Sequence, residues 1–498
     1  MSARKRARKK RAVRRNCRLR NRRRSSRRRV SHGDQLRWLG SWFLPDAEIF
    51  SNLGLHGNTT WKPLALVWLA LCWSWSECRN VTDAFTAAEA QCRALGFVSL
   101  STYQGLMQAL VVWTEPLLRV LWSVLHQRME QFGGRWWRIE GWVPIAFDGS
   151  RSTVPRTASA EQAFCASHYG QGKTAKYRKK KSQGMRRSRN KQCPPQPQEP
   201  QVWITLLWHM GLRLPWMWRL GPSNSSERAH VMEMLDCGEF PENTLFCGDA
   251  GFVGHPLWSR ILERGHHFLV RVGANVSLLG DLDCRSTHLG QVWCWPDAAI
   301  RSGQLPLRLR LVRVKIGKTR VWMLTSVCEA RRLSRADIVR FYRMRWGIEV
   351  EFRGLKQTLD RARLRCRNDR RLLVELDWSI LAMAVAELLA LKEQLSVNAT
   401  GTRHGTARGD PRRRSLAQTM RALRSCLTDL RHHPAEGQDL RTRLRHAVTD
   451  NYHRTSGKGA RYRPRNPDKK TLGNPNVRKP TNQQRQQLQT FKPRKAAV

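Results

Sequence analysis

Three acidic residues stand about one hundred positions apart, each where a fold could bring it to a common point: Asp148, Asp249 and Glu349. The first two each follow a short apolar run, GWVPIAF at 141–147 and TLFCG at 244–248, and each run predicts a strand. Glu349 lies within a helical pattern. Because sites in open α/β sheets form where strands end, a helix that crosses the sheet would add Glu349 to the two aspartates.

Three carboxylates that converge repel one another strongly unless a divalent cation neutralises them. Ligation by oxygen alone selects Mg²⁺ or Mn²⁺ over zinc. Two such ions, held about 3.5–4 Å apart, form a clamp for in-line attack on a phosphodiester. The acids therefore predict metal-dependent phosphoryl transfer with two ions.

A polar stripe on the helix that contains Glu349 supports this interpretation. Tyr342, Arg345, Glu349 and Lys356 are offset by 0, 3, 7 and 14 residues. At 100° per residue they point to about 0°, 300°, 340° and 320°, within one stripe roughly 60° wide. One interpretation is a solvated charged face with pairing between Arg345 and Glu349. The other places one metal ligand among donors for phosphate oxygens, and it also accounts for the tyrosine.

The charge of the chain points to a polyanionic partner. Its 498 residues include 90 Lys and Arg against 38 Asp and Glu, a net charge of +52. No apolar run reaches the ~20 residues of a membrane span, and no signal peptide is recognised, so a nucleic acid in the cytoplasm is favoured over a membrane. The 13 cysteines are odd in number and contain no Cys-x2-Cys pair, which argues against a zinc ribbon or a disulfide framework.

The pattern of elements divides the chain into four regions. They are a disordered basic arm (1–30), a helical N-terminal DNA-binding domain (31–135), an α/β core with a β-rich insertion at about 274–330 (136–395), and a basic C-terminal region with a disordered tail from about 462 (396–498). An alternative for the basic arm is a start codon assigned too far upstream.

Within these regions, periodicity and turn residues predict individual elements. Helices are expected at 61–75, 81–95, 225–236, 255–264 and 373–393, and strands at 201–209, 213–219 and 267–272. The helical run 101–130 contains Pro116, so a kink or two helices are expected there. One long helix is expected from Ser334, with Asp337 at the capping-box spacing.

The spacing Tyr-x2-Arg-x3-Glu-x6-Lys, present here as YRMRWGIEVEFRGLK, resembles the signature of IS4-family DDE transposases. FDGSRSTVPRT, which begins at Phe147, is similar to the first-aspartate region of that family, and GDAGF at 248–252 to its second. The resemblance covers roughly 140–395, about half of the chain. The helix signature is specific, whereas the two aspartate motifs alone are weak. EQAFC at 161–165 departs from relatives that often have Asn there.

The resemblance implies an α/β, RNase H-like mixed sheet flanked by helices. It implies that Asp148, Asp249 and Glu349 bind two Mg²⁺ or Mn²⁺ ions, and that Tyr342, Arg345 and Lys356 contact DNA. The expected activity is cut-and-paste transposition, by cleavage and strand transfer at terminal inverted repeats and target DNA. A homodimer on DNA, associated with the nucleoid, is also expected.

Three alternative functions are also considered. A decayed or domesticated DNA-binding protein would bind without cutting, but the three acids are all present. A simple metal-dependent nuclease would cut without strand transfer. A tyrosine recombinase would use Tyr342 as its nucleophile, and it would leave the acids unexplained.

Overall fold

A computed structural model gives the structure of residues 30–165, 199–280, 282, 290–396, 409–449 and 472–491, apart from residues 57, 58, 60, 99 and 318. The basic arm and most of the basic, Pro-rich loop around 171–200 lie outside the described residues.

The N-terminal region is helical, as the periodicity predicts. Its elements are α2 (His32–Phe43), the 3-10 helix η1 (Glu48–Leu53), α3 (Pro63–Trp75), α4 (Val81–Ala94) and α5 (Tyr103–Gly133). Side-chain oxygens of Ser31, Asn80 and Thr102 accept backbone N–H groups at the starts of α2, α4 and α5. Of the kink or the two helices expected at Pro116, the two helices are wrong, since α5 runs through this proline without interruption.

One mixed sheet forms the centre of the molecule. In the described residues its order is β10-β6-β7-β8-β9-β5-β4-β1-β2-β3. The strands are β1 (Val143–Thr153), β2 (Gln201–His209), β3 (Leu214–Gly221), β4 (Thr244–Gly248), β5 (His267–Val272), β6 (Ser277–Leu279), β7 (Gln291–Cys294), β8 (Leu307–Ile316), β9 (Thr319–Thr325) and β10 (Asn476–Arg478).

The first five strands have the RNase H-like arrangement. β1, β2 and β3 are antiparallel neighbours, while β4 pairs in parallel with β1 and β5 in parallel with β4. The expected α/β fold with this topology is therefore confirmed. The strands expected near 274–330 extend the same sheet, because β9 pairs antiparallel with β5.

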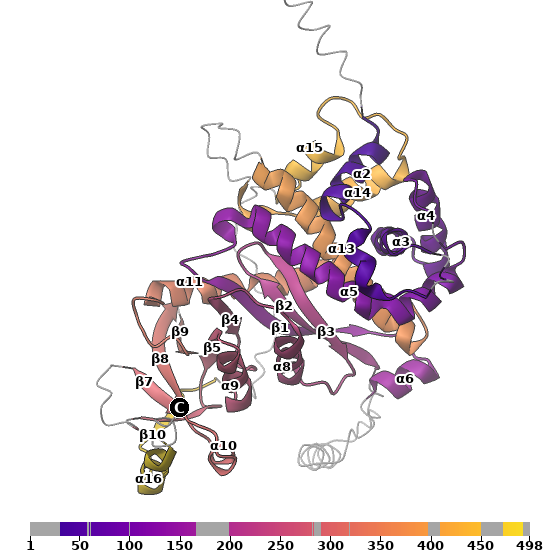
Figure 1. Ribbon diagram of the computed structural model, residues 1–498. Coiled ribbons are helices and arrows are strands. Elements are labelled where there is room, and N and C mark those ends of the chain that lie inside the picture. Colours follow the sequence, from indigo (N-terminus) through magenta and orange to yellow (C-terminus); the bar gives the residue numbers. More distant parts are fainter. Residues whose placement is uncertain are drawn as a thin grey trace, which may run out of the picture.

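Helices cover the sheet on both sides (Figure 1). The helices that follow β1 in the described residues are α6 (Ala158–Phe164), α8 (Glu227–Cys237), α9 (His255–Glu263), α10 (Asp297–Arg301), α11 (Arg335–Arg345), α12 (Gly347–Gln357), α13 (Asp369–Ser396), η5 (Pro411–Arg413), α14 (Leu416–Thr428), α15 (Leu440–Arg445) and α16 (Asn482–Phe491). Of these, α14 and α15 pack on α13. Figure 1 shows α8 and α9 on one side of the sheet, and α13 with the N-terminal helices on the other.

Helix α13 joins the N-terminal helices to the sheet. It contacts α3, α5, α14, α15 and β3. The Trp75 indole donates to the Ala382 carbonyl at 2.9 Å, which ties α3 to α13. A single cluster of buried apolar side chains runs from the N-terminal helices through the sheet to α15. No helix in the described part of the chain is long and apolar enough to cross a membrane.

The end of the chain corrects one prediction. A disordered tail was expected from about 462, but residues 472–491 contain β10 and α16. β10 pairs in parallel with β6 through the main chain, which needs no apolar sequence. Leu488 packs with Leu279 and Trp295 in a small second core. The rest of the predicted tail lies outside the described residues.

Candidate active site

Asp148 and Asp249 lie on neighbouring strands. In the parallel pair of β1 and β4, Ala146 lies opposite Cys247. The same register continued by two residues sets Asp148 beside Asp249, on strands about 4.8 Å apart. The predicted strand end at Asp148 is wrong, because β1 continues to Thr153 by pairing with β2. It is β4 that ends, at Gly248, directly before Asp249.

Glu349 lies in the first turn of α12, and a glycine allows that helix to approach the sheet. A β-carbon at Gly347 would collide with the Trp208 ring of β2. Trp208 pairs with Ala146 of β1, so it lies on the same face of the sheet as Ala146 and Asp148. The close contact at Gly347 therefore brings the start of α12 to the face that carries Asp148.

The single long helix predicted from Ser334 is two helices in the structure. α11 ends at Arg345 and α12 begins at Gly347, with Trp346 between them. The Trp346 N–H donates to Arg343 and Met344 carbonyls rather than four residues back, which tightens the turn. The expected capping box is present, with Ser334 and Asp337 bonded reciprocally at the start of α11.

Arg345 links the acids of the sheet and the helix. Its Nη1 lies 3.4 Å from Asp148 Oδ2, and its Nη2 lies 3.7 Å from Glu349 Oε1. The arginine side chain is 5% exposed, that of Asp148 20%, and that of Glu349 44%. The guanidinium therefore neutralises part of the negative charge from a buried position, while Glu349 faces solvent.

The charge of this region perturbs the Asp148 carboxyl. Its pKa is raised to about 6, mainly by burial and in smaller part by the nearby carboxylates Asp249 and Glu349, against the opposing effects of the Gly149 amide and Arg345. The Gly149 N–H donates to Asp148 Oδ1 at 2.8 Å. Asp249 is held in its turn by the Gly251 N–H, also at 2.8 Å. The charges of Asp249 and Glu349 thus act on the Asp148 carboxyl.

The carboxylates fit a hard divalent cation by their chemistry. Within the described residues, however, no group of three or more His, Cys, Asp or Glu side chains is arranged to hold a metal ion. The Arg345 guanidinium supplies the positive charge between Asp148 and Glu349 instead. An all-oxygen donor set suits Mg²⁺ or Mn²⁺. A cation would compete with Arg345 for the same oxygens.

The other residues of the polar stripe are less exposed than a DNA-binding face requires. Tyr342 is buried within the main core, and the Arg345 guanidinium lies over its ring at 5.6 Å. Lys356 is partly buried, which lowers the pKa of its amine. Tyr342 and Arg345 are thus inaccessible in this structure, and the contacts of all three with DNA stay predictions.

A fourth acid near the site escaped the sequence analysis. Glu227 is the first residue of α8, and a β-carbon at Gly149 would collide with its carboxyl. Burial raises the pKa of Glu227 to about 7, with further contributions from the charges of Asp148 and Asp249. Since Gly149 and Asp148 point to opposite faces of β1, Glu227 approaches from the face of α8. An acid in a first helical turn is common, so the sequence offered no signal for it.

Comparisons with known proteins agree with the resemblance of the motifs. A family model described as a transposase DDE domain matches residues 144–385, a range that includes all three acids. Transposase InsG for insertion sequence element IS4, from Escherichia coli (strain K12), is 29% identical over 170 residues. This match covers 32% of the chain and 37% of that relative, so the chain spans little more than a third of the relative's length.

One solved structure is also similar. The cryo-EM structure of a piggyBac transposase synaptic complex with hairpin DNA has a TM-score of 0.37 and 13% sequence identity, and the match covers 84% of this chain and 86% of that one.

Proposed function

Because residues 144–385 belong to the family of transposase DDE domains, we propose that the chain is an IS4-type, cut-and-paste DNA transposase. The observation that carries the proposal is the register of β1 and β4, which sets Asp148 beside Asp249, with Glu349 linked to Asp148 through Arg345. The substrates are the terminal inverted repeats of a mobile element and a target DNA. We expect two copies of the chain to act together, because two element ends must be joined.

In this proposal Asp148, Asp249 and Glu349 hold two Mg²⁺ or Mn²⁺ ions. When bound, the ions activate the attacking oxygen and stabilise the leaving oxygen of the phosphodiester. The chain's own residues fix the geometry. The strand register fixes the spacing of the two aspartates, and the contact of Gly347 with Trp208 fixes the approach of α12.

In this scheme Arg345 has two roles, one before metal binds and one after. It is buried, and it contacts both Asp148 and Glu349. Without metal it offsets the repulsion between their carboxylates. Its Nε has no hydrogen-bond partner within the described residues, so the side chain still has donor capacity. We propose that loading of the site shifts Arg345 away from the carboxylates and toward a phosphate oxygen, beside Lys356.

The reaction is a hydrolysis followed by a transesterification. Attack by water breaks one phosphodiester and leaves a 3′-hydroxyl at the element end. This hydroxyl then attacks a second phosphodiester, in the opposite strand or in the target DNA, and displaces its 3′-oxygen. A nuclease would stop after the first step.

A cleavage assay tests the proposal. Purified full-length protein is incubated with linear DNA that carries the gene and its flanking repeats, with Mg²⁺, with Mn²⁺, or with EDTA. We expect excision at the repeats and joining of the freed ends to a target plasmid, with either metal and not with EDTA. Full cleavage in EDTA would contradict the metal mechanism, and cleavage without any joined product would reduce the proposal to a nuclease.

A further inference from the structure

A second cationic feature lies away from the three acids. It is a cavity of about 520 Å³ between the N-terminal helices and the segment that follows α12. Four arginines line it: Arg79, Arg365, Arg367 and Arg371. No acidic residue is among its described lining residues. A cavity with four cations and no anion is suited to an anionic ligand.

Three long helices begin at this cavity. Asn80 and Val81 start α4, Tyr103 starts α5, and Asn368 precedes α13, and all four residues line the cavity. Asn368 caps α13, because its side chain accepts from the Arg371 N–H and its carbonyl from the Leu372 N–H. Helix N-termini carry partial positive charge and unpaired N–H groups, which favour anions. Their convergence here is independent of the arginines.

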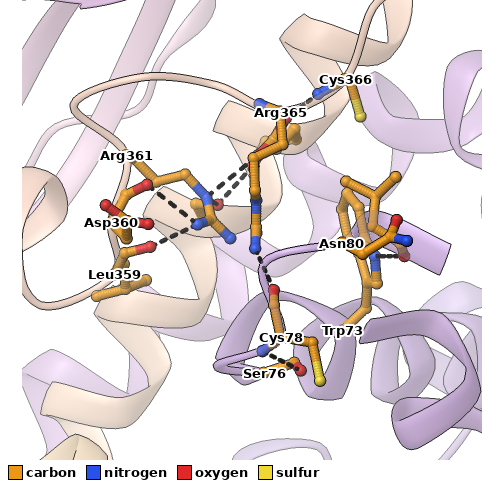
Figure 2. A network of polar contacts seen from close by, with 12 residues as sticks. Trp73, Ser76, Cys78, Asn80, Leu359, Asp360, Arg361, Arg365 and Cys366 are labelled. Carbon is orange, nitrogen blue, oxygen red and sulfur yellow. Dashed lines mark hydrogen bonds and ion pairs between the residues drawn. The ribbon is translucent and has the colours of Figure 1, made fainter. Parts of the chain in front are cut away.

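Arg365 is held in place at the cavity by its neighbours. Its Nε lies 3.1 Å from Glu375 Oε1, and its Nη1 donates to the Cys78 carbonyl at 2.6 Å. Figure 2 shows this side chain reaching from the segment after α12 to Cys78, beside the start of α4. Its Nη2 is buried and has no hydrogen-bond partner in the described part of the chain. An oriented guanidinium with a spare donor is a prepared anion site.

The Glu375 carboxylate beside Arg365 does not neutralise the positive charge of this cavity. Glu375 is 0% exposed and also lies 3.6 Å from Arg361, which is itself buried. One carboxylate thus serves two guanidinium groups. The buried set keeps a net positive charge, which adds to that of the exposed Arg79 and Arg367.

The cavity is connected to the active site through β1. The Thr153 N–H donates to the Ala362 carbonyl, and the Leu364 N–H donates to the Thr153 carbonyl. Thr153 lies five residues after Asp148 on the same strand, a span of about 17 Å.

We propose that this arginine cavity binds a backbone phosphate of the element-end DNA, away from the phosphodiester that is cut. The inference rests on the proposed function, and it assigns to that function a DNA contact outside the signature helix. A DNA strand is favoured over a free phosphate because the exposed Arg79 and Arg367 extend the positive charge beyond the cavity. The net charge of +52 also requires a polyanion.

The test compares two variants that remove arginines from the full-length protein. The double variant Arg79→Gln/Arg367→Gln removes two exposed cavity arginines whose side chains make no hydrogen bond or ion pair within the described residues. The control Arg93→Gln removes an exposed arginine at the other end of α4, roughly 18 Å away. Urea unfolding of all proteins checks that the fold is unchanged.

Binding of a fluorescent duplex with the flanking repeat is measured across a salt series. We expect the double variant to bind about tenfold or more weakly, with a slope of log affinity against log salt lower by about two. The control should change the slope by less than one. Duplexes that each carry one neutral methylphosphonate, at a different position beside the cut, are then compared. At least one of them should weaken wild-type binding and should weaken binding by the double variant much less.

Two results would overturn the inference. One is a double variant whose salt slope equals that of Arg93→Gln. The other concerns inorganic phosphate. If micromolar phosphate stabilises the wild type but not the double variant, while both proteins bind DNA equally well, the cavity binds a small anion instead. If the binding results are as expected but the wild type never cuts in Mg²⁺, the proposed function fails and the DNA contact stands.

Discussion

A partly buried carboxyl on α13 provides a quantitative test of the packing between that helix and the sheet. Asp377 Oδ1 accepts a hydrogen bond from the Trp218 indole of β3 at 2.8 Å. Burial raises the pKa of Asp377 to about 7, although the hydrogen bond from Trp218 and the charge of Arg219 act in the opposite direction. Asp377→Asn keeps the acceptor oxygen and removes the charge.

The sign of the effect follows from the two states of the chain. The unfolded chain releases the Asp377 proton near the ordinary value of 3.8, whereas the folded chain holds it up to about 7. Stability therefore falls as pH rises through this window, and the full cost is present above it. About 3 pH units at about 1.4 kcal/mol each give an upper limit of about 4 kcal/mol. Because Asp377 is partly exposed, we expect about half of this, ~2 kcal/mol.

Urea unfolding near pH 5 and near pH 8 measures the effect. Asp377→Asn should be more stable than the wild type by about 2 kcal/mol near pH 8, and the gain should shrink by about 1 kcal/mol near pH 5. Asp34→Asn is the control of opposite sign, because hydrogen bonds from Ser31 and Arg37 lower the pKa of Asp34. The reasoning would be refuted if Asp377→Asn were no more stable than the wild type near pH 8, or if its gain in stability were the same at both pH values.

Two further substitutions test the packing beside the three acids and beside the arginine cavity. Gly347→Ala places a methyl group against the Trp208 ring, so we expect the free energy of urea unfolding to fall by about 1–3 kcal/mol, and cleavage to slow as α12 moves away. Unchanged cleavage would show that this contact does not position Glu349. Glu375→Gln leaves two buried guanidinium groups, Arg361 and Arg365, without their anion, so we expect a loss of about 3–5 kcal/mol; a loss below about 1 kcal/mol would mean that the network is not a buried ion pair.

The sequence predicted best those elements whose own residues determine them. β4 and β5 have the predicted bounds, because each is a short buried apolar run between turn residues. The second half of β1, DGSRST, is polar and gave no strand signal. It is extended because β2, about fifty residues later, pairs with it up to Thr153. Pairing between distant segments cannot be predicted from the residues of either segment alone.

The signature helix shows the same limit at the site. Its four polar residues share one stripe, but periodicity does not say whether that stripe faces solvent or the sheet. Tyr342 and Arg345 proved to be buried, because α11 and the start of α12 pack against the sheet. The helical pattern also continues unbroken through Trp346, so the break between α11 and α12 has no signal in the spacing.

The central claim is that Glu349 is a catalytic carboxylate, and one pair of assays on one variant tests it most directly. Glu349→Ala removes a side chain that is 44% exposed, so the fold should persist. Element-end binding by gel shift should stay close to that of wild type, since loss of an anion does not weaken attraction to DNA. Cleavage in Mg²⁺ should fall by several orders of magnitude, whereas Glu263→Ala, an exposed carboxyl on α9, should cut normally. Cleavage by Glu349→Ala at the wild-type rate would contradict the account.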